Sequence, residues 1–81
     1  MEANYVAKNV GAKLCVYDKY ITVKKSFLSK EVMIPFKEIS SIESGILGLE
    51  INTKDKRSYK ISLTNNDKKK VREIVYEKIS E

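Results

Sequence analysis

Apolar side chains recur at every second position along most of this 81-residue chain, and the spacing changes to three and four positions near the C-terminus. Alternation is typical of a strand with one buried face and one wet face, whereas the longer spacing is typical of an amphipathic helix. The links between the runs are too short for parallel crossovers, so we expect antiparallel pairing. The predicted strands lie in the runs 5–8, 14–17, 21–24, 31–36, 47–52 and 58–63.

One further segment fits two structures. Phe36, Ile39, Ile42 and Ile46 are three to four positions apart, as in a short helix, but the same residues also fit a bent strand with a bulge. Two consecutive serines and the β-branched isoleucines weaken a helix, and Gly45 follows closely. We therefore predict a seventh strand in this segment.

Turn-forming residues separate the predicted strands. Asp18–Lys19 suits a tight hairpin, and Lys54–Lys56 separates two later strands. Gly11 supplies a residue that tolerates positive φ in the first link. Pro35 predicts an edge strand, a bulge or a strand end, because proline cannot donate a hydrogen bond to a sheet.

The C-terminal segment carries a single helical stripe. Val71, Ile74, Val75 and Ile79 follow this spacing, and the polar residues 64–67 supply an N-cap and a carboxylate for the first turn. The spacing predicts a helix over about residues 66–79. A helix of this length is marginal in water by itself, so the stripe must be buried against the strands.

Together these elements predict one domain, residues 1–81, with a mostly β fold. The strands occupy about residues 4–63 and form a small seven-stranded antiparallel barrel that is partly open. The C-terminal amphipathic helix caps this barrel, which buries both apolar patterns in one core.

The residue types exclude several kinds of chemistry. The chain has no His and one Cys, so His-containing catalytic sites, disulfides within the chain and Cys/His metal clusters cannot form. Cys15 lies in an apolar run, where a free Cys is usually a small buried hydrophobe. The three glycines form no phosphate-binding loop. We therefore predict no enzymatic activity, no catalytic residue, no metal and no cofactor.

Two segments and the closing helix resemble bacterial pleckstrin-homology-like domains. The first segment is KLCVYDKYITVK at residues 13–24, and the second is MIPFKEISSIE at residues 33–43. The resemblance covers about residues 12–79 and implies a binding or assembly module. It also implies that the links 9–12, 26–30 and 54–56 share one end of the barrel.

Half of the basic residues lie near these three links. The chain has sixteen Lys and Arg against eleven Asp and Glu, and this net charge of +5 favours acidic or polyanionic partners. If the links share one end, they form a basic rim, and Phe27 and Leu28 between its lysines are candidates for contact with a membrane or a partner. The preferred interpretation at this point is that solvated lysines blunt the strand edges. The rim candidates are Lys8, Lys13, Lys24, Lys25, Lys30, Lys54, Lys56 and Arg57.

Three classes of function remain, and we rank them in this order. The first is a non-catalytic module for protein association, including self-association into a homo-oligomer through open strand edges and amphipathic tyrosines. The alternative is peripheral binding to anionic membrane lipids through the basic rim. Nucleic-acid binding through residues 68–70 and Arg72 is third and is not favoured, because few aromatic residues accompany this basic run, and we expect these residues to form a solvated face of the helix instead. Because the sequence shows no signal peptide and no membrane span, the expected location is the cytoplasm, or the inner face of the membrane under the lipid alternative.

Overall fold

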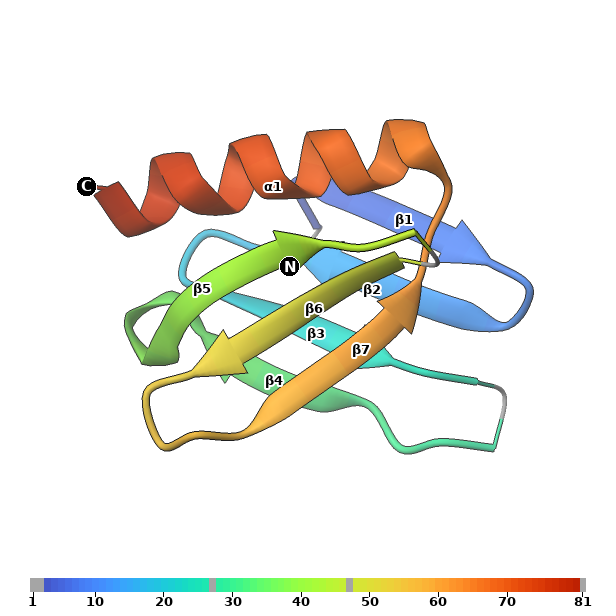
Figure 1. The fold of residues 1–81 in the computed structure, drawn as a ribbon, viewed down its shortest axis with the longest axis horizontal. Helices are drawn as coiled ribbons and strands as arrows, with labels where there is room; N and C mark the ends of the chain where they lie inside the picture. The colour runs from blue at the N-terminus through green and yellow to red at the C-terminus, as the bar shows by residue number, and fades with distance from the viewer. Residues whose placement is uncertain (1–2, 27, 47, 81) are drawn as a thin grey trace.

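Two antiparallel sheets and one C-terminal helix make up the computed structural model of the chain (Figure 1). The structure describes residues 3–26, 28–46 and 48–80. In chain order the elements are β1 (Tyr5–Asn9), β2 (Ala12–Val16), β3 (Tyr20–Lys24), β4 (Val32–Pro35), the 3-10 helix η1 (Phe36–Glu38), β5 (Ile39–Ser44), β6 (Gly48–Thr53), β7 (Ser58–Ser62) and α1 (Asn65–Ser80).

Each sheet is a simple meander. The strand order is β1-β2-β3-β4 in one sheet and β5-β6-β7 in the other, and all neighbouring strands are antiparallel. The predicted strands and the predicted helix are confirmed within the described residues, and Leu47 of the run 47–52 lies outside them. The two sheets are not closed into a barrel, so that part of the prediction is wrong. Pro35 ends β4, lacks an N–H group and leads directly into η1, so β5 begins a new sheet.

Residues 36–46, which fitted either a short helix or a bent strand, contain both a helical turn and a strand. Residues 36–38 form the turn of 3-10 helix η1, and β5 is a strand whose register with β6 shifts between Ile39 and Ser41. The predicted bulged strand is therefore confirmed for residues 39–44. Ile46 lies beyond this strand, in the link to β6.

Alternate residues of both sheets point into one shared core. Leu14 and Ile21 from the first sheet, and Leu49 and Ile51 from the second, are fully buried. Each buried aliphatic side chain of this size contributes about 1.5–3 kcal/mol to the free energy of folding. The period-two pattern in the sequence therefore corresponds to the inner faces of the two sheets.

The helix covers the side of the core where β1 and β5 lie (Figure 1), and its main contacts are with η1, β1, β2, β5 and β6. Val71 and Val75 are fully buried and Ile74 is half-buried, so this part of the predicted stripe faces the sheets, whereas Ile79 at its end is exposed. The Thr64 hydroxyl accepts a hydrogen bond from the Asp67 N–H at 3.3 Å, which identifies Thr64 as the N-cap.

Candidate functional site

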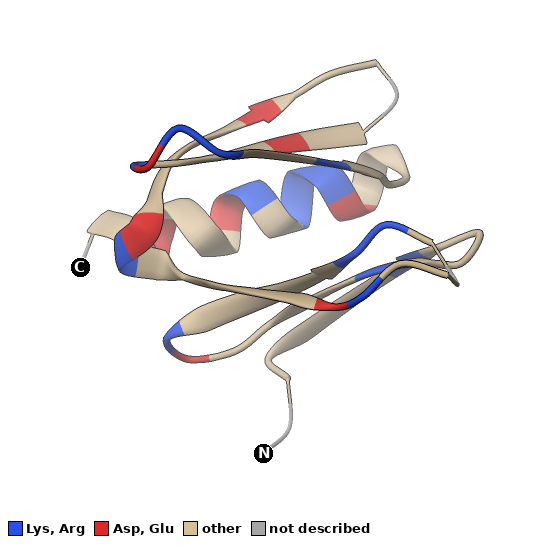
Figure 2. Ribbon diagram, turned by 90° about the horizontal axis from the view of Figure 1, so that it is seen from below, with Lys and Arg blue, Asp and Glu red and all other residues tan. Residues whose placement is uncertain are grey.

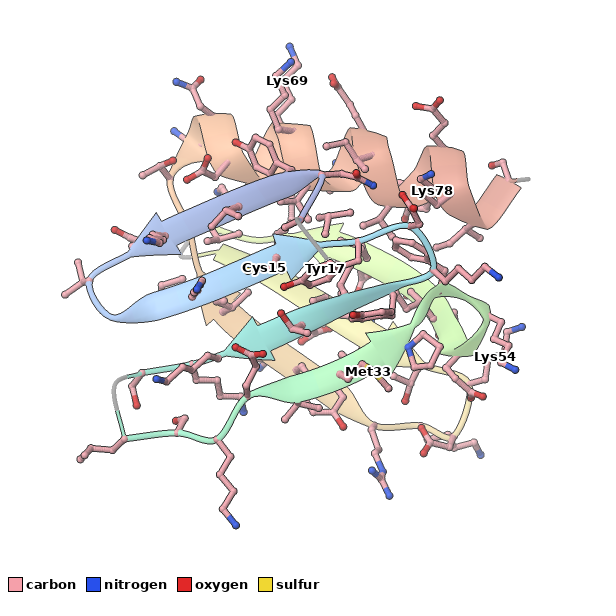
Figure 3. The ribbon with its side chains drawn as sticks, turned by 180° about the vertical axis from the view of Figure 1, so that it is seen from behind. Cys15, Tyr17, Met33, Lys54, Lys69 and Lys78 are labelled. Carbon is pink, nitrogen blue, oxygen red and sulfur yellow. The ribbon has the colours of Figure 1, made fainter. Side chains whose placement is uncertain are left out.

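The links between strands lie alternately at two ends of the molecule, because the chain reverses direction at every strand (Figures 1 and 3). The β1–β2, β3–β4 and β5–β6 links lie at one end, and the β2–β3 link, η1 and the β6–β7 link lie at the other. β4 ends, and β5 begins, at the end of the molecule where η1 lies. The link 54–56 is therefore at that end, whereas the links 9–12 and 26–30 are at the other, so the expectation that all three share one end is wrong. The structure therefore separates Lys54, Lys56 and Arg57 from the other rim candidates, which are Lys8, Lys13, Lys24, Lys25 and Lys30.

Three of these five lysines form a row across the first sheet. Lys8 lies opposite Lys13 in the register of β1 and β2, and Lys13 lies opposite Lys24 in the register of β2 and β3. Like charges placed directly opposite one another destabilise a sheet. Among the described residues, the ion pairs join Arg57 to Asp55 and Lys60 to Glu50, so no ion pair neutralises the row.

The links at this end also carry aliphatic side chains that face water. Val10 in the β1–β2 link is 93% exposed, Leu28 in the β3–β4 link is 98% exposed, and Ile46 in the β5–β6 link is 97% exposed. Phe27, the other predicted contact residue, lies outside the described residues. We call this end, with Val10, Leu28 and the five lysines, the lysine-rich end.

The backbone at Val10 is held in an unfavourable conformation. Its φ is 46° and that of Gly11 is 85°, the signs that a type I′ hairpin turn requires at its two central positions. Glycine tolerates this region, as predicted for Gly11, but a β-branched residue with positive φ is a genuine outlier. Val10 therefore costs free energy in the folded chain and gains no burial in return.

A groove of about 970 Å³ lies at the opposite end, between η1, the ends of β3 and β4, and the last turn of α1. Its apolar lining includes Met33, which is 61% exposed, and Ile79, which is 36% exposed. Lysines from four separate segments surround these side chains. They are Lys19, Lys37, Lys54 and Lys78.

The β6–β7 link forms one side of this groove and is held by polar contacts. The Lys54 N–H donates to the Glu38 carbonyl oxygen at 2.8 Å, which ties the link to η1. Asp55 accepts a hydrogen bond from the Thr53 hydroxyl and pairs with Arg57 at 3.2 Å. The Thr53 hydroxyl first, and then the Arg57 guanidinium, hold the pKa of the Asp55 carboxyl below its ordinary value.

The basic run of α1 is divided by the fold. Lys68 is buried, with 8% exposure, and its ammonium group donates to the Gly45 carbonyl oxygen at 2.7 Å. Lys69 projects into solvent (Figure 3), and the Arg72 guanidinium lies 5.7 Å from the centre of the Tyr76 ring. Sequence reasoning placed all of this run in water and missed the burial of Lys68. The signal was its position three residues before Val71, on the apolar stripe.

Cys15 is buried on β2 and carries a free thiol. Nearby, the rings of Tyr17 and Tyr20 stack with their centres 4.7 Å apart. In the described ranges, no group of three His, Cys, Asp or Glu side chains is placed to hold a metal ion. Figure 2 shows the charged residues at both ends of the molecule and along the helix.

No helix within residues 3–26, 28–46 and 48–80 has the length and apolar character needed to cross a membrane. Comparisons of the chain with protein-family models, with curated proteins and with solved structures found no match. The resemblance to pleckstrin-homology-like domains therefore stays a prediction.

Proposed function

We propose that the chain is a non-catalytic, pleckstrin-homology-like binding module that docks on anionic membrane surfaces through its lysine-rich end. The main observation that supports this proposal is that one end of the molecule combines two almost fully exposed aliphatic side chains, Val10 and Leu28, with five lysines. This proposal takes up the membrane alternative of the sequence analysis, with a rim that is smaller than the predicted one and lacks the β6–β7 link.

The lysine row supplies the electrostatic part of this argument. Because Lys8, Lys13 and Lys24 repel one another in the free protein, an anionic surface relieves the repulsion and also attracts each lysine. A lysine near an anionic leaflet contributes about 1 kcal/mol to binding at moderate salt. The five lysines together therefore suffice for reversible binding. Glu31, next to Lys30, is exposed and subtracts from this attraction.

The two aliphatic tips supply the apolar part. Transfer of a Val or Leu side chain from water to an apolar environment is favourable by about 1.5–3 kcal/mol. Val10 also occupies a turn position where Asn or Gly would be more stable, so the folded state itself gives no reason for a valine there. A role in contact with a partner or a lipid surface accounts for an apolar residue that destabilises the free protein.

The third exposed tip fits less well with an anionic membrane. Glu43 on β5 lies opposite Glu50 on β6, close to the link that carries Ile46. Lys60 pairs with Glu50 at 3.6 Å, and the Asn52 amide donates to Glu43 at 3.2 Å. The links of the four-stranded sheet are therefore assigned as the contact with lipid, and the β5–β6 link is not.

Co-sedimentation with vesicles tests the proposal. The vesicles contain phosphatidylcholine alone or about one part phosphatidylserine to three parts phosphatidylcholine, and binding is measured over a range of salt concentrations. We expect salt-sensitive binding to the anionic vesicles that is weakened by about tenfold or more in the variant Lys24→Glu plus Lys25→Glu. A matched control, Lys37→Glu plus Lys78→Glu, makes the same charge change at the opposite end of the molecule and should bind nearly as the parent does.

Two results would remove the membrane function. One is an equal loss of binding in both charge variants, which would mean that net charge alone attracts the protein. The other is an absence of binding to anionic vesicles at low salt. The variant Leu28→Asn tests the apolar contact separately, and we expect it to weaken binding without changing stability, because Leu28 is exposed.

Self-association, which was part of the first-ranked prediction, has its own test. Light scattering over a range of protein concentrations distinguishes a monomer from a homo-oligomer. If the protein self-associates through the lysine-rich end, Leu28→Asn should dissociate the oligomer. In that case vesicle binding that requires the monomer would decrease as protein concentration rises.

A further inference from the structure

The groove beside η1 joins segments that are distant in the sequence, and nothing in the proposed membrane contact uses it. It lies at the end of the molecule opposite the lysine-rich end, where Figure 3 shows Lys54 and Lys78. We infer that this groove binds an acidic peptide segment that carries apolar side chains. We call it the η1 groove, and its argument is independent of the membrane proposal.

The apolar surface of the η1 groove comes from residues at the boundary of the core. Phe36 and Ile39 are buried at its base, whereas Met33 on β4 and Ile79 on α1 remain partly in water. Met33 occupies an outward-facing position of the first sheet and is 61% exposed. Methionine is unbranched and polarisable, and it adapts to partners of different shape. The groove therefore offers an apolar contact that the fold itself does not need.

The charge of the η1 groove is mainly positive, with four lysines and one aspartate in its lining. Lys19, Lys37, Lys54 and Lys78 come from the β2–β3 link, η1, the β6–β7 link and the helix C-terminus, respectively. Asp18 is the acidic residue in the lining, and its carboxylate accepts a hydrogen bond from the Asn4 amide at 2.9 Å.

Other acidic side chains near the η1 groove offset only part of this charge. Glu38 is exposed beside Lys37 on η1 and subtracts from it, whereas Asp55 next to Lys54 is engaged by Thr53 and Arg57. Neither of the ion pairs found within the described ranges includes one of the four groove lysines. The η1 groove therefore presents an excess of positive charge around an apolar surface.

This combination selects among partners. A second copy of the chain carries a net charge of +5 and is repelled. A single nucleic-acid strand requires exposed stacking platforms. Of the aromatic residues in the lining, Phe36 is buried, and Tyr20 is half-buried and already stacks on Tyr17. Lysines are flexible point charges rather than bidentate forks, and this suits carboxylates on a chain better than one rigidly held phosphate.

The edge strand of the groove also limits how a peptide binds. β4 has four residues and ends at Pro35, which cannot donate a hydrogen bond to an added strand. The peptide is therefore held by its side chains, with carboxylates at the lysines and apolar residues on Met33 and Ile79. Exposed ion pairs contribute about 0.2–1 kcal/mol each, so we expect a weak and salt-sensitive complex.

Fluorescence anisotropy with a labelled peptide of alternating Glu and Leu tests this inference. The comparison peptides replace Glu by Gln, replace Leu by Ser, or replace Glu by Lys. We expect binding of the Glu/Leu peptide alone, and a loss of affinity of about tenfold or more in the variant Lys37→Glu plus Lys78→Glu. Lys69→Glu plus Lys70→Glu is the control with the same change in net charge and should keep most of the affinity.

Met33→Ser tests the apolar contact. Because Met33 is largely in water, this substitution should leave the free energy of unfolding nearly unchanged and should weaken the peptide complex. Equal loss of affinity in the two charge variants, equal binding of the Glu/Ser peptide, or no binding of the Glu/Leu peptide would each overturn the inference. Vesicle binding by the Lys37→Glu plus Lys78→Glu variant is expected to persist, which separates a failure here from a failure of the membrane proposal.

Discussion

The hydroxyl of Tyr76 on α1 bonds to both backbone polar groups of Ile42 on β5. It donates to the Ile42 carbonyl oxygen at 2.9 Å and accepts from the Ile42 N–H at 3.4 Å. β5 is the edge strand of the second sheet, so these backbone groups have no partner strand on that side. One side chain of the helix therefore satisfies an edge that would otherwise be open to another chain.

We predict that Tyr76→Phe lowers the free energy of unfolding by about 1 kcal/mol, because the ring remains and the two hydrogen bonds are lost. Urea denaturation measures the change, and hydrogen exchange at the Ile42 amide should become faster. Tyr20→Phe is the control, since the Tyr20 hydroxyl makes no hydrogen bond with the described residues. An Ile42 amide that exchanges at the parent rate in Tyr76→Phe would contradict the assigned role.

The side chain of Lys68 makes a second hydrogen bond between α1 and the part of the chain that forms the second sheet. Substitution by Met keeps most of the buried aliphatic chain but removes the ammonium group that donates to the Gly45 carbonyl oxygen. We predict that Lys68→Met costs about 1.5–3 kcal/mol, the range for a hydrogen bond to a charged group. Lys69→Met, at an exposed position on the same turn, should cost much less in the same urea experiment.

Substitution by alanine should have different effects on stability at the two glycines near the β5–β6 link. A Cβ at Gly48 would lie 1.9 Å from the Ile61 carbonyl oxygen, so Gly48→Ala must move β6 away from β7. We expect a loss of about 3 kcal/mol or more in the free energy of unfolding. At Gly45 the nearest atom to such a Cβ is the Gly48 carbonyl oxygen at 3.7 Å, an ordinary contact. Gly45→Ala should therefore leave the free energy of unfolding nearly unchanged. Thermal unfolding of both variants measures the difference, and equal melting temperatures would contradict the prediction.

The bond between Tyr5 and Asp67 predicts a sensitivity to alkaline pH. The Tyr5 hydroxyl donates to Asp67 at 2.5 Å, and this bond, burial and the carboxylate charge raise the pKa of Tyr5 above its ordinary value of 10.0. A raised folded-state pKa gives a stabilisation that is complete below pH 10 and is lost as the pH rises through the folded pKa. At neutral pH, Tyr5→Phe should cost about 1 kcal/mol.

The measurement is urea unfolding of the parent and Tyr5→Phe at neutral pH and above pH 10. The difference in the free energy of unfolding between the two proteins should shrink at the higher pH. Lysines lose charge in the same range, but they are common to both proteins, so the difference isolates Tyr5. A difference that is constant with pH would show that the Tyr5 hydroxyl does not lose its bond on ionisation.

Most of the fold follows from local patterns in the sequence. Alternation identifies a strand wherever one face is buried, as at Leu49 and Ile51, and the stripe through Val71 and Val75 identifies the helix. Pro35 marks a strand end because its missing N–H is a local property. The closure of the sheets is not local, because it depends on how η1 directs β5 relative to β4.

The candidate sites depend on more than these patterns. The prediction of one basic rim formed by all three links is wrong, because the direction of each strand decides at which end its link lies. The link that carries Lys54 therefore lies beside η1 and away from Lys13. Ile46 continues the apolar spacing of Ile42, but the chain has turned by that point and leaves it in water. Helical spacing would have found Lys68, if its charge had not been taken as proof of exposure.

Stability and membrane contact favour different residues at position 10, since the positive φ favours Asn or Gly and contact with lipid favours an apolar side chain. Val10→Asn would place Asn-Gly in a type I′ turn, and we predict a gain of about 1 kcal/mol in the free energy of unfolding. The same variant should bind anionic vesicles less strongly, because the apolar tip is lost. Stabilisation with unchanged vesicle binding would show that Val10 does not touch the lipid.

The separation of the two ends has a consequence for how the protein would sit at a bilayer. The molecule measures 32 Å along its longest axis, with the lysine-rich end and the η1 groove at opposite ends (Figure 1). A leaflet's potential decays within about 8–10 Å at physiological ionic strength. A protein standing on its lysine-rich end would therefore hold the groove beyond the reach of that potential, so phospholipid head groups and an acidic polypeptide would not compete for the same cations.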